Sequence, residues 1–304
     1  MLEDVKNALA GVVGITVTPF DEAGAVDTAA YRRLVRRIVD GGVTALTPNG
    51  NTSEYYALTP AEHELAVRLT LEEAPDALVL PGLGGAVETL VDDARRLARL
   101  GVRAVMVHQP VHPFWSGAGW VDLHRRIADA LPDMGIVPYL RSDRVTASDL
   151  GELISSCPNV VAVKYAIADP TAFAACVSVI GTERVTWICG LAEMWAPFFA
   201  IAGATGFTSG LVSVDPQRSL RMLEALQRGD YASAMEQWAR LREFEHLRSR
   251  RDSELNVSVV KAALAELDLC RADVRAPLHE LTTHDRAIVR RIVGEWGMLP
   301  LSDR

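Results

Sequence analysis

Amine chemistry in this chain has three candidate side chains, because lysine occurs only at Lys6, Lys164 and Lys261 and the other basic residues are arginines. Arginine stays protonated and is not a nucleophile. Lys164 ends the apolar run NVVAVK (159–164), where strand alternation places it on the side of two small apolar residues. Desolvation there lowers the pKa of a lysine, and its neutral amine can then attack a carbonyl carbon. The alternative is an ammonium group that reaches the rim of the fold or pairs with a carboxylate.

Tyr139 ends the preceding apolar run, IVPYL (136–140), at the corresponding position. A tyrosine in this place can relay a proton if its hydroxyl reaches a donor, an acceptor or a substrate. The alternative is a core aromatic side chain with a hydrogen-bonded hydroxyl. Directly after it, Arg141 and Arg144 can each bind a carboxylate through two parallel N–H bonds. Either arginine can instead be a surface residue paired with Asp143.

Two further segments are candidates for ligand binding. The loop PNGNTSEYYALT (48–59) gathers amides and hydroxyls around a glycine just before a helix, and such groups can hold a carboxylate. His108 and His112 have the spacing of metal ligands on a helix, but Pro110 and Pro113 place them in a loop. We therefore expect no metal site at this pair.

Strand and helix patterns alternate along the first three quarters of the chain. Short runs rich in Val and Ile, typical of parallel strands buried on both faces, are each followed by a segment of helical periodicity. The expected strands are 12–17, 43–47, 77–81, 102–107, 136–140, 159–164, 184–189 and 205–208. The expected helices are 27–39, 60–74, 87–99, 119–130, 147–156, 170–180, 192–202 and 216–228. Eight such units predict a (β/α)8 TIM barrel, an α/β fold whose active site lies at the C-terminal ends of the strands.

The rest of the chain carries only helical patterns. We therefore expect a barrel over 1–228 and a helical extension over 229–304 that packs on it. The expected helices of the extension are 230–249, 256–267 and 284–296. The charged stretch REFEHLRSRRDSE (242–254) is predicted to be a solvated helix surface and loop. The rival architecture is a doubly wound open sheet, but GLGGAV (82–87) has valine where the third glycine of the dinucleotide fingerprint belongs.

The composition excludes several classes of protein. The chain has 304 residues, of which 49% are hydrophobic and 23% charged, so it can bury a large core and is not disordered. Its net charge of −8 argues against binding to nucleic acid or to an anionic membrane surface. Glu3 and Asp4 stand where a signal peptide carries positive charge, and no apolar run approaches about 18 residues. We expect a cytoplasmic protein without a nucleic-acid or membrane partner.

The order of these motifs resembles the family of dihydrodipicolinate synthases and N-acetylneuraminate lyases, which are class I aldolases. The resemblance rests on GITVTPF (14–20), GNTSEYYALT (50–59), a tyrosine ending strand five, a lysine ending strand six and GATGFTSG (203–210). It covers essentially the whole chain. It implies that Lys164 forms a Schiff base with the keto carbon of pyruvate or another 2-oxo acid, and that Tyr139 shuttles protons.

The resemblance also implies a substrate-binding set. Its members are Asn51, Thr52, Ser53, His112, Arg144, Gly190, Gly206 and Ser209. Thr52 and the amide of Ser53 match the groups that bind the carboxylate of the 2-oxo acid, and Arg144 matches the arginine that holds the carboxylate of the second substrate in the synthases. Gly190 and the segment 206–209 match residues that line the pocket.

The chain departs from the family pattern where the synthases place a hydroxyl relay. Asn51 replaces the first threonine of the loop, and Ser53 replaces its glycine. After the fourth strand, Pro110, Val111 and His112 stand where the synthases have Pro-Tyr-Tyr, so the tyrosine that they supply across a dimer interface is absent. His112 can replace it as an acid or base, or can have no catalytic role.

The resemblance therefore predicts a lyase that needs no metal or cofactor and acts through a lysine Schiff base. Its substrate would be pyruvate or a 2-keto-3-deoxy sugar acid, and the reaction an aldol cleavage or condensation, or a dehydration. The first alternative is 4-hydroxy-tetrahydrodipicolinate synthase, which joins pyruvate to aspartate semialdehyde. The second is a non-catalytic barrel that binds a 2-oxo acid. The resemblance also implies a homotetramer built as a dimer of dimers.

Overall fold

A curled parallel sheet forms the centre of the computed structural model, which describes residues 2–299 and so excludes the last five residues of the predicted extension. Within that range, the nine strand segments lie in the order β3-β2-β1-β9-β8-β7-β6-β5-β4. They are β1 (Val12–Ile15), β2 (Ala45–Thr47), β3 (Leu78–Val79), β4 (Gly82–Leu83), β5 (Ala104–Val107), β6 (Gly135–Leu140), β7 (Ala162–Tyr165), β8 (Thr186–Cys189) and β9 (Gly206–Ser209). The first strand pairs with the last, as in a TIM-barrel-like α/β fold.

The two outer segments of this order, β3 and β4, are consecutive in the chain. The segment 78–83 bonds to neighbours on both sides: the Leu80 amide donates to the Leu46 carbonyl (2.8 Å), and the Met106 amide donates to the Pro81 carbonyl (2.9 Å). Proline has no N–H, so Pro81 interrupts the regular ladder between β3 and β4. This explains why one strand expected over 77–81 is found as two short segments.

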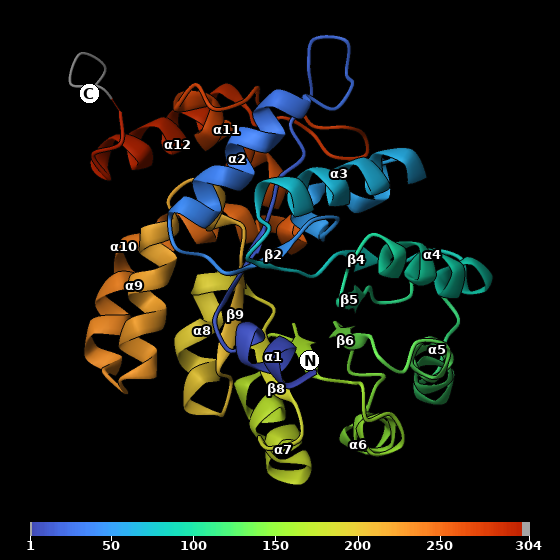
Figure 1. The fold of residues 1–304 in the computed structure, drawn as a ribbon. Coiled ribbons are helices and arrows are strands. Elements are labelled where there is room, and N and C mark those ends of the chain that lie inside the picture. Colours follow the sequence, from blue (N-terminus) through green and yellow to red (C-terminus); the bar gives the residue numbers. More distant parts are fainter. Residues whose placement is uncertain (1, 300–304) are drawn as a thin grey trace.

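Eight helices follow the strands and cover the outside of the sheet (Figure 1). Within residues 2–299 they are α2 (Thr28–Asp40), α3 (Pro60–Glu73), α4 (Val87–Arg99), α5 (Gly117–Ala130), α6 (Ala147–Ser156), α7 (Pro170–Ile180), α8 (Ala192–Ile201) and α9 (Pro216–Gln227). Asp27 caps α2 as predicted, and Asp169 and Asp215 cap helices whose first residue is proline. The predicted alternation of strands and helices is confirmed.

A short helix that was not predicted from the sequence, α1 (Leu2–Leu9), lies beside β8 (Figure 1). Val5 and Leu9 are buried and pack in one cluster with Val13, Ala45 and Ala162 from the strands. α1 therefore covers the end of the sheet where the strands begin. Eight residues are too few to show helical periodicity clearly.

Within residues 2–299, three more helices follow α9: α10 (Tyr231–Ser253), α11 (Asn256–Glu266) and α12 (Thr283–Glu295). α10 packs against α8 and α9, and α11 packs against the 3-10 helix Asn51–Ser53. The backbone of α10 leaves helical geometry at Arg250, one residue after the predicted end. The prediction of a solvated charged stretch is wrong for Glu245 and Arg248, which are buried. No helix within residues 2–299 is both long enough and apolar enough to cross a membrane.

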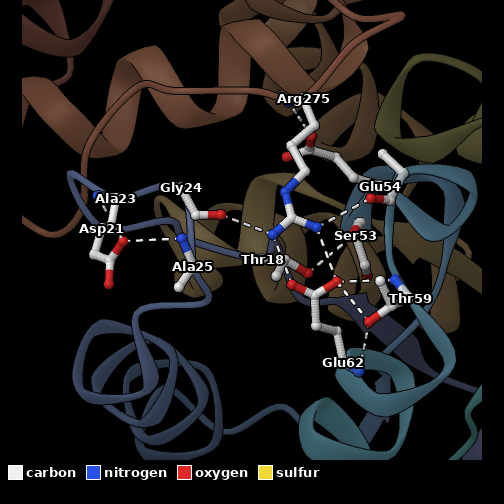
Figure 2. Close-up of polar contacts among 11 residues, drawn as sticks. Thr18, Asp21, Ala23, Gly24, Ala25, Ser53, Glu54, Thr59, Glu62 and Arg275 are labelled. Carbon is white, nitrogen blue, oxygen red and sulfur yellow. Dashed lines mark hydrogen bonds and ion pairs between the residues drawn. The ribbon is translucent and has the colours of Figure 1, made fainter.

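An ionic cluster joins the C-terminal segment to the loop after β2 (Figure 2). Glu54 is fully buried and accepts hydrogen bonds from Nζ of Lys261 (2.5 Å) and from the backbone amide of Arg275 (2.8 Å). The guanidinium of Arg275 donates to both carboxylate oxygens of Glu62 (2.6 and 2.8 Å). Glu54 has a φ of 63°, a left-handed conformation that tertiary contacts must hold in place. The loop that begins at Asn51 is therefore fixed from the far end of the chain.

Replacing Lys261 with methionine is expected to destabilise the protein by about 3–5 kcal/mol, because it leaves the Glu54 carboxylate buried without its cation. The free energy of unfolding can be measured by urea titration. The double variant Glu54→Gln/Lys261→Met removes both charges and should recover most of the loss. Equal stability of the single variant and the wild type would contradict the importance of this buried pair.

Candidate active site

Lys164 lies at the C-terminal end of β7, directly opposite Tyr139 of β6 in the parallel register. Only 2% of its surface is exposed, and its Nζ lies 4.0 Å from the centre of the Tyr139 ring. Burial lowers the pKa of Lys164 to about 7, and the positive charge of Arg141 contributes to the lowering. A large fraction of the amine is therefore neutral near pH 7, as a nucleophile requires.

This lowered pKa predicts the pH dependence of the reaction. The value of kcat/KM is expected to rise about tenfold per pH unit below about pH 6 and to level off above about pH 8, because only the deprotonated amine attacks. Arg141→Met removes a neighbouring positive charge, so it should move the midpoint of the profile to higher pH. A pH–rate profile of both proteins checks this. A wild-type midpoint near pH 10, the ordinary range of lysine, would contradict the desolvated nucleophile.

Tyr139 is the second buried group at this position. Burial raises its pKa, while the charge of Arg141 and the side chain of Asn51 lower it to a smaller extent. Arg141 lies over the Tyr139 ring, with its Cζ 5.8 Å from the ring centre. The hydroxyl consequently keeps its proton at neutral pH and can donate it to an oxygen that develops negative charge.

Both side chains line a cavity of about 870 Å³ at the C-terminal ends of the strands. Of the predicted substrate-binding residues, three also line it: Asn51, Thr52 and Gly190. They come from the loop after β2 and from the end of β8, so the structure brings together side chains that are far apart in sequence. A cavity of this size accepts a substrate much longer than a three-carbon acid.

Ser53 is buried beside this cavity and takes part in the hydrogen bonding of its own loop. Its Oγ donates to the Thr16 carbonyl (2.5 Å) and accepts from the Gly50 amide (3.1 Å). Its backbone amide donates to the Gly50 carbonyl (3.0 Å), and Thr18 donates to its carbonyl (Figure 2). Ser53 thus holds the loop in which Thr52 faces the cavity.

Two predicted residues, Arg144 and His112, lie outside the cavity lining. Arg144 is exposed, lies over the ring of Trp115 (5.3 Å) and donates to the Pro113 carbonyl (3.1 Å). His112 is exposed, and its Nδ1 lies 3.1 Å from the backbone of Phe114. Arg141, three residues before Arg144, is the arginine of this pair that lines the cavity.

Gly206 and Ser209 also lie away from the cavity. Gly206 begins β9, and a Cβ atom there would come within 2.4 Å of the Leu9 carbonyl oxygen, at the end of the sheet that α1 covers. The hydroxyl of Ser209 points outward to Ser219 of α9 (3.1 Å). Thr208 and Gly210 are the residues of this segment that line the cavity.

The C-terminal helices supply part of the cavity wall, which was not predicted from the sequence. Arg248 of α10 and Asn256 at the start of α11 line the cavity, as does Tyr56 from the loop after β2. Tyr56 belongs to the motif GNTSEYYALT and could have been found there. Arg248 sits in a highly charged stretch, where the sequence does not distinguish a buried arginine from a solvated one. Within residues 2–299, no group of three or more His, Cys, Asp and Glu side chains is placed to hold a metal ion.

Comparisons with known proteins agree with this geometry. A relative from Rhodococcus jostii (strain RHA1), named as a probable 5-dehydro-4-deoxyglucarate dehydratase, is 31% identical over 89% of this chain and 90% of its own. The crystal structure of dihydrodipicolinate synthase from Bacillus clausii has a TM-score of 0.92 and 39% identity, covering 96% of this chain and 99% of that one. The synthase structure from Oceanobacillus iheyensis has a TM-score of 0.93 and 33% identity, covering 98% and 99%.

The family model for the dihydrodipicolinate synthetase family matches residues 8–295, which include the barrel-like sheet, the buried lysine and the C-terminal helices. The chain therefore belongs to the dihydrodipicolinate synthetase family.

Proposed function

We propose that this protein is a lyase that acts through a Schiff base of Lys164 on pyruvate or on a 2-keto-3-deoxy sugar acid. The observation that carries the proposal is the buried amine of Lys164, whose pKa of about 7 makes it a nucleophile, next to the Tyr139 ring at the end of the sheet. Family membership supports the same chemistry. Arg141 at the same cavity supplies positive charge for an anionic substrate.

The reaction begins when Nζ of Lys164 attacks the keto carbon and forms a carbinolamine. Tyr139 gives a proton to the departing hydroxyl, water leaves, and a protonated imine remains. The imine withdraws electrons, so the adjacent carbon can lose a proton and form an enamine. The enamine then expels the hydroxyl of the next carbon as water in a dehydration. In an aldol cleavage, the hydroxyl of that next carbon instead loses its proton and becomes an aldehyde, while the electrons of the bond between the two carbons move to the imine and give the enamine of pyruvate, which then takes up a proton. Hydrolysis of the imine frees Lys164 in both cases.

We propose that Thr52 binds the carboxylate next to the keto group, in the loop that Glu54 and Lys261 hold in place. Among the possible reactions, dehydration of a sugar acid is supported by the name of the relative from Rhodococcus jostii. Synthesis of 4-hydroxy-tetrahydrodipicolinate is supported by the names of the solved structures. It is disfavoured here, because Arg144 lies over Trp115 and a tyrosine is missing at His112.

Product analysis on a substrate panel tests the proposal. Incubation with 5-dehydro-4-deoxyglucarate is expected to give a dehydrated 2,5-dioxo product, and release of pyruvate from a 2-keto-3-deoxy sugar acid would assign an aldolase instead. Either product supports a Schiff-base lyase. If pyruvate plus aspartate semialdehyde is the only combination in the panel that reacts, the protein has the synthase activity. If these compounds bind and none of them reacts, the result favours the non-catalytic barrel.

We propose three further features of the molecule. First, 78–83 acts as one interrupted strand, which makes the sheet a closed (β/α)8 barrel over 1–228 with a helical extension over 229–304.

Second, the protein is a homotetramer built from dimers. The exposed apolar side chains of Val111 and Phe114 next to His112 support an interface there. Third, it works in the cytoplasm on a small molecule, without a cofactor and without nucleic-acid or membrane partners.

A further inference from the structure

Arg248 is a buried arginine that lines the cavity from α10, the helix that follows α9. Only 5% of its surface is exposed. Its Nε and Nη2 donate to Oδ1 of Asn256 (3.0 and 2.7 Å), and its Nη1 donates to Oε1 of Glu245 (2.7 Å). A guanidinium has five N–H groups, so one on each terminal nitrogen is left after these three bonds. Among residues 2–299 these two have no hydrogen-bond partner, and they can serve a ligand.

A glycine makes room for this guanidinium at the cavity wall. A Cβ atom on Gly210 would lie 2.8 Å from Nη2 of Arg248 and 3.1 Å from Cγ2 of Thr52. Any larger residue at position 210 would therefore push the arginine away. Gly210, Thr52 and Arg248 all line the same cavity, so the arginine is part of the wall that a substrate contacts.

Arg248 and Lys164 belong to different parts of the cavity wall. Lys164 comes from β7, whereas Arg248 comes from α10 and lies next to Gly210, which follows β9. A ligand bound to both side chains bridges these two parts of the wall, and the cavity volume of about 870 Å³ leaves space for a substrate longer than a three-carbon acid.

The charged and polar groups around Arg248 allow its guanidinium to bind an anion. Glu245 neutralises part of its charge, and Asn256 is uncharged and fixes the plane of the guanidinium. Glu193 is the other acid close to Glu245, and burial raises its pKa, which favours the uncharged form of its carboxyl group. Desolvated N–H groups of a fixed guanidinium form strong paired bonds with a carboxylate.

We propose that Arg248, held by Asn256 and set against Gly210, binds a second carboxylate at the far end of the substrate. It is the specificity-determining residue that makes the site prefer 2-oxo dicarboxylates over 2-oxo monocarboxylates of equal length. This inference rests on the proposed function, because it takes for granted that the keto end of the ligand is bound to Lys164.

Borohydride trapping with a matched pair of probes tests this role without depending on the later reaction. 2-Oxoadipate and 2-oxohexanoate have the same six-carbon chain and differ by the terminal carboxylate. The concentration that gives half-maximal trapping is measured for each acid and for pyruvate. The wild type is expected to need at least about tenfold less 2-oxoadipate than 2-oxohexanoate. The variant R248M should lose this preference and keep the wild-type value for pyruvate.

Two further variants separate binding from structure. R248M leaves Glu245 buried without a partner, so the double variant E245Q/R248M provides a neutral pair that should fold and show the same loss of preference. R240M removes an exposed arginine from the same helix and should retain the preference.

Three results would overturn the assignment: equal trapping of both six-carbon acids by the wild type, retention of the preference in E245Q/R248M, or an equal weakening of pyruvate and 2-oxoadipate. Absence of any adduct with all three acids is a different result, which overturns the proposed function and this inference with it.

Discussion

Replacing Lys164 with methionine is expected to lower turnover by at least about four orders of magnitude, because the reaction loses the nucleophile through which every covalent intermediate forms. Methionine is close to lysine in length, and its apolar side chain can occupy the buried position of Lys164, so the cavity should keep its shape. The loss should appear in kcat as well as in kcat/KM. Steady-state kinetics on the substrate turned over by the wild type provides the measurement.

The chain offers a matched control for this variant in Lys6, a partly exposed lysine outside the cavity lining. Lys6 lies on α1, at the opposite end of the sheet, where it faces Glu3 at 3.8 Å. Lys6→Met removes the same charge and should leave turnover within about twofold of the wild type, as is usual for surface substitutions. If Lys164→Met retained more than a tenth of the wild-type activity, Lys164 would not be the nucleophile.

The second large effect is expected for Tyr139→Phe, which should lower kcat by about 10²- to 10³-fold through the loss of a proton donor. The phenyl ring can still lie next to Nζ of Lys164, so burial of the amine should persist. The slow step should then be loss of water from the carbinolamine. Rapid-quench trapping with borohydride measures the rate at which the imine appears.

Tyr165→Phe is the control, because Tyr165 follows Lys164 in β7 and faces the helices. Its ring packs against Phe173 of α7 at a centre distance of 5.1 Å. Removal of that hydroxyl should leave the rate of imine formation nearly unchanged. Equal rates in Tyr139→Phe and the wild type would show that another group, or water, supplies the proton.

Strand alternation was enough to predict the central features of the site. A period of two in NVVAVK placed Lys164 on the inner side of β7, and the neighbouring strand placed Tyr139 beside it. The same period could have corrected the assignment at the last strand. Thr208 and Gly210 line the cavity, and Ser209 between them faces α9.

Tertiary contacts determine which arginines line the cavity, and the sequence alone does not show them. Arg141 and Arg144 have the same chemistry and are three residues apart. Which of them lines the cavity depends on whether the side chain turns toward Tyr139, as in Arg141, or toward Trp115, as in Arg144. Arg248 comes from a stretch of alternating charge, and its burial results from partners on α10 and α11. No local sequence pattern shows which way these side chains turn or which of them the fold buries.

The imine between Lys164 and a 2-oxo acid is tested most directly by the intact mass of the protein after borohydride reduction in the presence of pyruvate. The wild type and Lys6→Met are expected to gain the mass of one reduced pyruvate per chain, located on Lys164 by peptide mapping, and Lys164→Met is expected to gain none. An unmodified wild type under saturating pyruvate, or an adduct that persists in Lys164→Met, would contradict the claim.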